Sequence, residues 1–324
     1  MTELVDKNLC SNYSLNINES PIGSASQFDK YFLIAVPLPW KGEITESKKF
    51  PKEIKSLIDQ HSDLLQTTKI LGFHTENKYY NPNKTHIILF KKPKESLEKF
   101  SKLEFFPDQK NLEELIHNLF HSNYQNHPSQ INQSHKFRDL LICTHGARDT
   151  CCASIGYPIY KKILSSKKSS EIRVLQVSHI GGHRFAPNII DMPNGRNWVK
   201  ITKDSINTFI SQKKPMRFFK ENYRGWTILK TGFEQVAERE AFSIEGWNWT
   251  NKKIISIQTS ETTNSNDSKL IKIKYSNQDG TEIKKIYVEV KKTGKLPVLK
   301  CTKDEITEYS QQFEVMKVSS NELS

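Results

Sequence analysis

Residues 139–158 read DLLICTHGARDTCCASIGYP, and residues 173–186 read RVLQVSHIGGHRFA. The apolar runs 139–142 and 173–177 predict two buried strands, and the stretch 153–164 predicts a helix between them. A strand, helix, strand unit of this length is typical of two parallel neighbours with a right-handed crossover. The two predicted strands should therefore end side by side in one α/β sheet.

Two cysteines and two histidines follow the ends of these predicted strands. Cys143 lies where the first strand ends, and Cys152 follows nine residues later at the start of the helix. His179 and His183 come just after the second strand. Because the ends of adjacent parallel strands open on one crevice, we expect the four side chains to converge there. Two thiolates and two imidazoles suit either a structural zinc ion or a [2Fe-2S] cluster, and the spacing leaves both open.

Residues around these four ligand candidates are expected to shape the site without binding metal. Gly181 and Gly182 separate the two histidines, and without Cβ atoms they let backbone N–H groups approach a metal centre. His145 is expected to hydrogen-bond close to a ligand, and Arg148 to form an ion pair with the neighbouring Asp149 or to tune the charge of the site. The remaining members of this surrounding layer are Cys151 and Arg184, and Arg184 is expected to be solvated or to meet an acidic partner surface.

The motifs C-T-H-G-x-R-D-x-C-C and S-H-x-G-G-H-R-F-A resemble the signature of the sucrase/ferredoxin-like family. The resemblance covers residues 20–245 and includes PIGSA at 21–25, PLPWKG at 37–42, YRG at 223–225 and QVAE at 235–238. It implies that the second half is similar to thioredoxin-like ferredoxins. Fungal relatives bind a [2Fe-2S] cluster through two cysteines and the two histidines of H-x-G-G-H, which implies Cys143, Cys152, His179 and His183 as ligands. Cys151 departs from the family pattern, since the residue at that position need not be cysteine.

The sequence is compatible with three classes of function. The leading prediction is an electron-transfer protein, a redox carrier rather than a turnover enzyme, whose imidazole ligands keep a titratable N–H and so couple electron transfer to protons. The second is a zinc-stabilised thioredoxin-like interaction module. The third is a thiol-dependent oxidoreductase using Cys151 or Cys152, although neither lies in a C-x-x-C sequence at a helix start.

The periodicity of the remaining chain predicts an α/β (α+β) fold with two thioredoxin-like domains in tandem and a small β-rich C-terminal appendage. The expected divisions are an extended N-terminal arm at 1–27, a first domain at 28–136 that ends in a linker from 121, a ferredoxin-like domain at 137–249, and the β-rich extension at 250–324. In the extension, alternating apolar residues at 271–275 and 286–290 flank Asp279-Gly280, which predicts a hairpin.

The net charge and the apolar runs indicate which partners and which compartment to expect. Lys and Arg number 48 against 36 Asp and Glu, a net charge of +12, but the lysines are scattered as on a solvated surface rather than gathered into a nucleic-acid site. The expected partner is a redox protein, with an acidic face as one option. The longest apolar run, 31–38, is too short to cross a membrane, and the first residues lack a secretory signal, so a cytoplasmic location is expected. Cys10 and Cys301 stand alone in the sequence.

Overall fold

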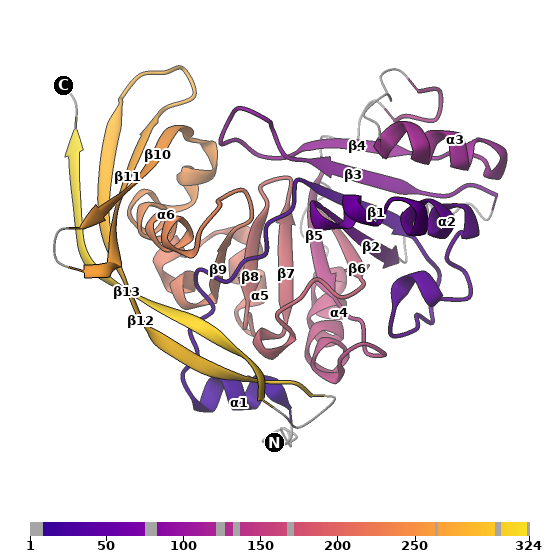
Figure 1. The fold of residues 1–324 in the computed structure, drawn as a ribbon, viewed down its shortest axis with the longest axis horizontal. Helices are drawn as coiled ribbons and strands as arrows, with labels where there is room; N and C mark the ends of the chain where they lie inside the picture. The colour runs from indigo at the N-terminus through magenta and orange to yellow at the C-terminus, as the bar shows by residue number, and fades with distance from the viewer. Residues whose placement is uncertain are drawn as a thin grey trace.

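The structure, a computed structural model, describes residues 9–74, 83–120, 127–131, 137–166, 172–262, 265–301 and 306–322. Within these residues the strands form one nine-stranded mixed sheet and one separate four-stranded antiparallel sheet (Figure 1). The predicted α+β fold class is confirmed. Most of the predicted linker at 121–136 lies outside the described residues.

The first half of the large sheet has the strand order β4-β3-β1-β2. β1 is parallel to β2 and antiparallel to β3, and β3 is antiparallel to β4. Its elements are β1 (Lys30–Ala35), α2 (Lys52–Gln60), β2 (Thr68–His74), β3 (Ile87–Lys91), β4 (Ser101–Phe105) and α3 (Gln109–Phe120), with short 3-10 turns at Ile44–Glu46 and Ser62–Gln66.

The second half repeats this arrangement in the order β6-β5-β7-β8-β9. β5 is parallel to β6, as predicted, and antiparallel to β7, which pairs with β8. Its elements are β5 (Arg138–Cys143), α4 (Tyr157–Ser165), β6 (Ile172–Val177), β7 (Asn188–Met192), β8 (Arg196–Val199), α5 (Ile206–Ser211), β9 (Tyr223–Trp226) and α6 (Gly232–Glu245). The halves join where β2 pairs antiparallel with β6, at Phe73 and Val177 among others, so that nine strands form one sheet.

Alternating side chains of β1 divide the hydrophobic core. Phe32 and Ile34 pack with α2 and α3 in a cluster of the first half. Tyr31 and Leu33 point to the opposite face and join a larger cluster that continues through the second half into the C-terminal sheet. Because both faces are covered, β1 is apolar at every position from Tyr31 to Ala35, as expected for a strand buried on both sides.

The C-terminal residues form the antiparallel sheet β10-β11-β12-β13. The predicted hairpin is confirmed, since Ile273 on β11 pairs with Ile286 on β12. The bounds are β10 (Lys253–Thr262), β11 (Ser265–Ser276), β12 (Lys284–Leu299) and β13 (Ile306–Glu322). β12 and β13 form a long hairpin whose far end reaches the N-terminal helix (Figure 1). α6 packs between this sheet and the large one and begins with a capping box of Thr231 and Glu234.

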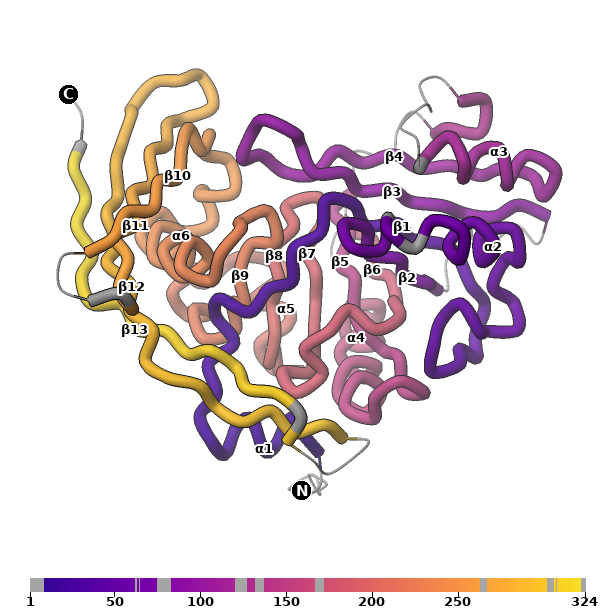
Figure 2. The backbone as a smooth tube through the Cα atoms, viewed as in Figure 1, coloured from indigo at the N-terminus to yellow at the C-terminus, as the bar shows by residue number. Residues whose placement is uncertain are grey.

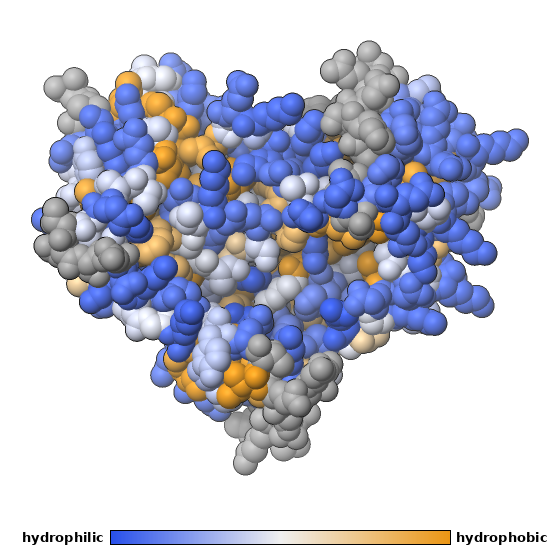
Figure 3. Space-filling view, viewed as in Figure 1, coloured by the Kyte–Doolittle hydropathy of each residue, from blue (hydrophilic) through white to orange (hydrophobic). Residues whose placement is uncertain are grey.

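The N-terminal arm differs from the prediction because Cys10–Asn16 form a helix, α1. The buried face of α1 includes Cys10, Ser11 and Ser14, so short polar residues pack where an apolar stripe would have signalled a helix. After α1 the chain runs across the second half toward β1 (Figure 2). On the face seen in Figure 3, hydrophilic side chains cover most of the surface, in keeping with the scattered lysines.

Candidate metal centre

The pairing of β5 with β6 places the two motifs together. Cys143, the last residue of β5, pairs with Val177, the last residue of β6, so the loops that carry the ligand candidates start side by side. Cys152 begins a π-helical turn that runs to Gly156 and leads into α4. A Cβ on Gly156 would lie 2.1 Å from the carbonyl oxygen of Cys143, so only glycine allows this turn to approach the strand end.

Three of the four predicted ligands gather in one group. The ligand atoms of Cys143, Cys152 and His179 all lie within 4.8 Å of one another, with both cysteines buried. Cys152 Sγ lies 3.8 Å from His179 Nδ1. The hydrogen bond from the Cys152 thiol lowers the pKa of Cys143 well below its ordinary value, and the same contact raises the pKa of Cys152. Within this pair, Cys143 is therefore the thiol that loses its proton more readily.

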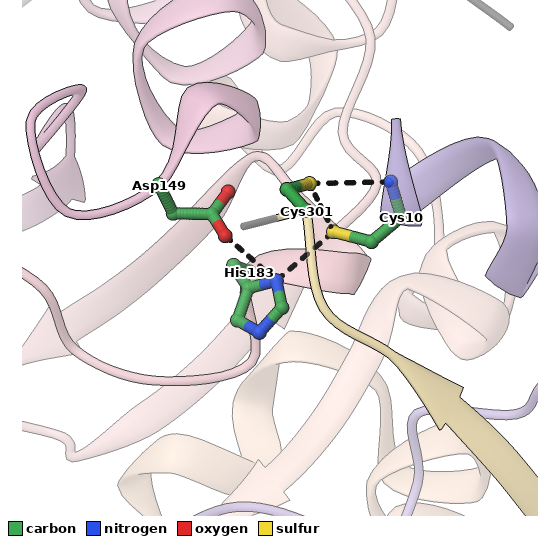
Figure 4. Close-up of side chains that lie close together, drawn as sticks. All are labelled: Cys10, Asp149, His183 and Cys301. Atoms are coloured by element: carbon green, nitrogen blue, oxygen red, sulfur yellow. Dashed lines mark hydrogen bonds and ion pairs between the residues drawn. The ribbon is translucent and has the colours of Figure 1, made fainter. Parts of the chain in front are cut away.

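His183, the fourth predicted ligand, lies in an adjacent group with Cys10, Asp149 and Cys301 (Figure 4). Its Nδ1 is 3.0 Å from Asp149 Oδ2 and 2.9 Å from Cys10 Sγ. Burial lowers the pKa of His183, although the Asp149 carboxylate opposes this. Since the rings of His179 and His183 have centroids 5.9 Å apart, the two groups are neighbours.

Cys151 lies in this second group rather than with Cys152. Its Sγ is 3.3 Å from that of Cys10 and 3.1 Å from that of Cys301. Cys10 and Cys301 therefore do not stand alone in the fold. The sequence offered no signal for this, because 291 positions separate them and neither lies in a motif.

His145 links the site to the first half of the molecule. Its Nε2 lies 2.7 Å from the carbonyl oxygen of Lys41, and its Nδ1 accepts the backbone N–H of His179 at 3.2 Å. The two contacts together require Nε2 to carry the proton. The ring of Trp40 packs edge-on against it, with centroids 5.5 Å apart. His145 thus joins the backbone of Lys41 to the backbone N–H of His179.

The Gly-Gly loop between the histidines rests on a buried arginine. Arg224 donates from Nη1 to the carbonyl oxygen of Gly181 at 3.1 Å, and from Nη2 and Nε to the carbonyl and hydroxyl oxygens of Ser24. Burial lowers the pKa of Arg224 to about 10. The PIGSA and YRG segments therefore meet at this loop, which explains in physical terms why they occur together with the H-x-G-G-H motif.

The two arginines of the predicted surrounding layer have partners in the chain. Arg148 pairs with Glu43 in the first half rather than with Asp149, whose Oδ1 instead accepts the N–H of Cys151 at 2.9 Å. Arg184 pairs with the buried Glu19 at 2.7 Å. The sequence had suggested that Arg184 is solvated or meets a partner surface, and this ion pair within the chain replaces both. A residue two positions before the predicted PIGSA segment thus neutralises the arginine that follows the second histidine.

Comparisons with known proteins show which family this chain resembles. The profile of the family described as sucrase/ferredoxin-like matches residues 21–225. Altered inheritance of mitochondria protein 32 of Meyerozyma guilliermondii is 29% identical over 98 residues, 27% of this chain and 34% of that protein. The protein of the same name in Candida glabrata is 28% identical over 102 residues, 28% of this chain and 33% of that protein. The alignments therefore span about a third of each relative. No solved structure matches the chain.

Among the described residues, no helix combines the length and the apolar character that crossing a membrane requires.

Proposed function

The chain belongs to the sucrase/ferredoxin-like family, and from this premise we propose that it is an electron-transfer protein that binds a [2Fe-2S] cluster through Cys143, Cys152, His179 and His183. The observation that carries the proposal is the gathering of two buried thiols and one imidazole within 4.8 Å, at the ends of two parallel strands. Thiolate and imidazole are the donors that iron in such clusters takes from proteins.

The environment of His183 fits the fourth ligand. Metal-bound histidines commonly donate the N–H of their other ring nitrogen to a carboxylate, which fixes the orientation of the ring. Asp149 Oδ2, 3.0 Å from Nδ1, is such an acceptor. We therefore assign Nε2 as the atom of His183 that binds iron.

A cluster at this position supplies one-electron transfer, at a potential that imidazole ligands raise relative to thiolates. Cys143 and Cys152 are each 1% exposed, so the protein keeps water away from the thiolate ligands. With Nε2 on iron, a proton on Nδ1 of His183 would donate to Asp149 Oδ2, 3.0 Å away, and we propose that this proton leaves and returns as the charge of the site changes. The chain can thus act as a carrier whose electron and proton move together.

The net charge of +12 supports an acidic redox protein as the partner. We propose the cytoplasm as the compartment. Fractionation of cells that express the full chain tests this, because recovery in mitochondria would contradict it.

Metal and acid-labile sulfide analysis of anaerobically purified protein tests the cofactor. We expect about two iron atoms and two sulfides per chain, red-brown colour, and an EPR signal after reduction. Protein that was produced under iron-replete conditions and contains no sulfide would contradict the proposal. It would favour the zinc-stabilised module or the thiol oxidoreductase.

Single cysteine variants test the ligand assignment. Cys143→Ser and Cys152→Ser should each lose most of the visible absorption, because a serine hydroxyl is a harder and far less acidic ligand than a thiol. Cys151→Ser is the matched control, since its Sγ faces Cys10 and Cys301 instead, and it should keep the wild-type spectrum. If Cys151→Ser loses the visible absorption and Cys152→Ser keeps it, the second cysteine ligand is Cys151 rather than Cys152.

A further inference from the structure

Three cysteines from distant parts of the chain meet beside the proposed cluster site. Cys10 comes from α1, Cys151 from the turn before α4, and Cys301 from the chain just after β12. The Sγ atoms are 2.7 Å apart for Cys10 and Cys301, 3.3 Å for Cys10 and Cys151, and 3.1 Å for Cys151 and Cys301. All three are free cysteines. Each sulfur therefore contacts the other two, and no pair is covalently joined.

This group is enclosed and is supplied with further donors. Cys10 and Cys151 are 0% exposed, and apolar side chains that include Leu9, Ile155 and Leu299 pack around the thiols. Asp149 lies beside two of them: one carboxylate oxygen lies within 4.8 Å of the sulfurs of Cys10 and Cys301, and His183 offers a ring nitrogen in the same group. Two buried cysteines, the half-buried Cys301 and the buried Asp149 thus offer three sulfurs and one oxygen, which is the number of donors that a four-coordinate ion needs.

A disulfide explains this arrangement less well than a metal does. One disulfide would use two of the sulfurs and leave the third thiol with the buried carboxylate, whereas one ion engages all three sulfurs and the carboxylate. Thiolates select thiophilic ions, and Zn²⁺ forms closed four-coordinate sites with three cysteines and one further ligand.

We propose that Cys10, Cys151 and Cys301, with the carboxylate of Asp149, form a second metal site that binds Zn²⁺. It goes beyond the proposed electron-transfer function and does not depend on it. Cys10 and Cys301 lie outside the residues that the family profile matches, 21–225, so the profile does not account for this site. Its consequence is structural: one ion ties α1 and the far end of the β12–β13 hairpin to the loop that carries Cys151.

Zinc content separates this site from the cluster site. Wild-type protein purified with iron and zinc present should hold about one Zn²⁺ per chain in addition to its iron. Cys10→Ser and Cys301→Ser should each lose that zinc. Cys301→Ser should also keep the iron content and visible spectrum, whereas Cys10→Ser tests the zinc alone, because Cys10 Sγ lies 2.9 Å from Nδ1 of His183. Cys143→Ser is the reciprocal control and should lose iron while keeping zinc.

Each outcome decides one of the two proposals. Zinc retained at one per chain in both Cys10→Ser and Cys301→Ser would overturn the second site, as would reduced wild-type protein that takes up no added Zn²⁺. Wild-type protein that holds one Zn²⁺ per chain and no iron would overturn the cluster proposal alone.

Hydrogen exchange gives a measurement that does not depend on either metal analysis. Removing Zn²⁺ with a chelator should speed amide exchange in α1 and in the last residues of β12, because the ion no longer joins them. Exchange in β1 and β3, in the first half, is the internal reference and should not change. Equal exchange in α1 with and without Zn²⁺ would contradict the proposed tie.

Discussion

Gly181 and Gly182 both adopt left-handed backbone conformations between the two histidines, with φ of +89° and +74°. They differ in what a Cβ would meet. At Gly182 it would lie 2.5 Å from Nη1 of Arg224, whereas at Gly181 the nearest atom is Ser26 Oγ at 4.0 Å. The two positions therefore separate backbone strain from a steric clash.

We predict that Gly182→Ala destabilises the protein by about 2–4 kcal/mol, because it adds a clash with a buried guanidinium to the strain of a positive φ. Gly181→Ala, the matched control, should cost only about 1 kcal/mol from strain. Denaturant unfolding of both iron-free variants measures the difference. Equal losses would show that Arg224 moves away freely.

The proposed imidazole ligands predict that the reduction potential of the proposed cluster depends on pH. The reduced site is more negative and holds the ring proton of its histidines more tightly, so the potential should fall as pH rises above the ligand pKa of the oxidised protein. The slope should reach up to ~59 mV per pH unit for one proton per electron. Protein-film voltammetry from about pH 6 to 10 measures it. Replacing both His179 and His183 by cysteine should lower the potential and reduce its dependence on pH. A wild-type potential that does not change with pH would contradict proton coupling and indicate a simple electron carrier.

The sequence predicted the residues whose position follows from strand ends, and missed those placed by the tertiary fold. Cys143, Cys152 and His179 converge because two parallel neighbours end together, which the βαβ pattern already implies. The contact of Cys10 with Cys301 depends on a helix and a hairpin docking from opposite ends of the chain, and no local pattern encodes it.

At the level of elements, the β3–β4 hairpin meets β5 and β6 through a buried charged network. Glu104 on β4 contacts His86 at 2.5 Å and Arg173 on β6 at 2.6 Å. Arg173 also binds Asp139 on β5 at 2.6 Å, and Lys102 contacts the second oxygen of Asp139 at 2.5 Å. These charges compensate one another, so breaking one pair would leave the others buried and uncompensated.

This network predicts a specific loss of stability in acid. Burial alone would raise the pKa of Glu104, but the hydrogen bond from His86 and the charge of Arg173 outweigh it and lower the pKa to about 2 from 4.5. The ionised carboxylate therefore stabilises the fold fully above pH 4.5, and this contribution is lost as pH falls toward 2. Glu104→Gln should cost about 3 kcal/mol at pH 7 and less at pH 3. Urea unfolding at both pH values measures the two costs, and equal costs would contradict the ionic role.

Buried polar and charged side chains explain which strands escaped prediction. β4, with the sequence SKLEF, was missed because Lys102 and Glu104 alternate with its apolar residues and read as surface charges. β7 and β9 were missed as well, since β7 carries the buried Asn188 and Asp191 and β9 carries Arg224 and Gly225. Strands with strong apolar runs, β5 and β6, were predicted at 139–142 and 173–177 and differ from the observed bounds by about one residue.

At the scale of the whole molecule, the tandem α/β halves and the C-terminal hairpin could be predicted, but their assembly could not. Local periodicity defines each half, whereas the edge pairing of β2 with β6 involves only two residues on each strand. The packing of the N-terminal segment and the β12–β13 hairpin against α6 likewise depends on side chains that meet only in the folded chain.

Phe313 on β13 is the side chain at which these three segments meet. Its ring packs edge-on against Phe233 of α6, with centroids 5.2 Å apart. A Cβ on Gly23 or Gly232 would lie 2.9 Å or 2.6 Å from the ring, so both glycines are needed for its close approach. The N-terminal segment, α6 and the C-terminal hairpin therefore share one contact.

We predict that Phe313→Ala lowers the free energy of unfolding by about 2–3 kcal/mol, because the half-buried ring leaves a gap that three separate segments would have to close together. Tyr309, four residues earlier on the same strand, is 64% exposed, and Tyr309→Ala is the matched control with an expected loss below about 1 kcal/mol. Denaturant unfolding of the iron-free proteins gives both values. Phe313→Ala should also speed amide exchange in β12, since the hairpin is held to α6 through this ring, whereas exchange in β3 should stay unchanged. Similar losses for the two variants would mean that the hairpin is held by its strand pairing alone and that Phe313 does not join the ends of the chain to the large sheet.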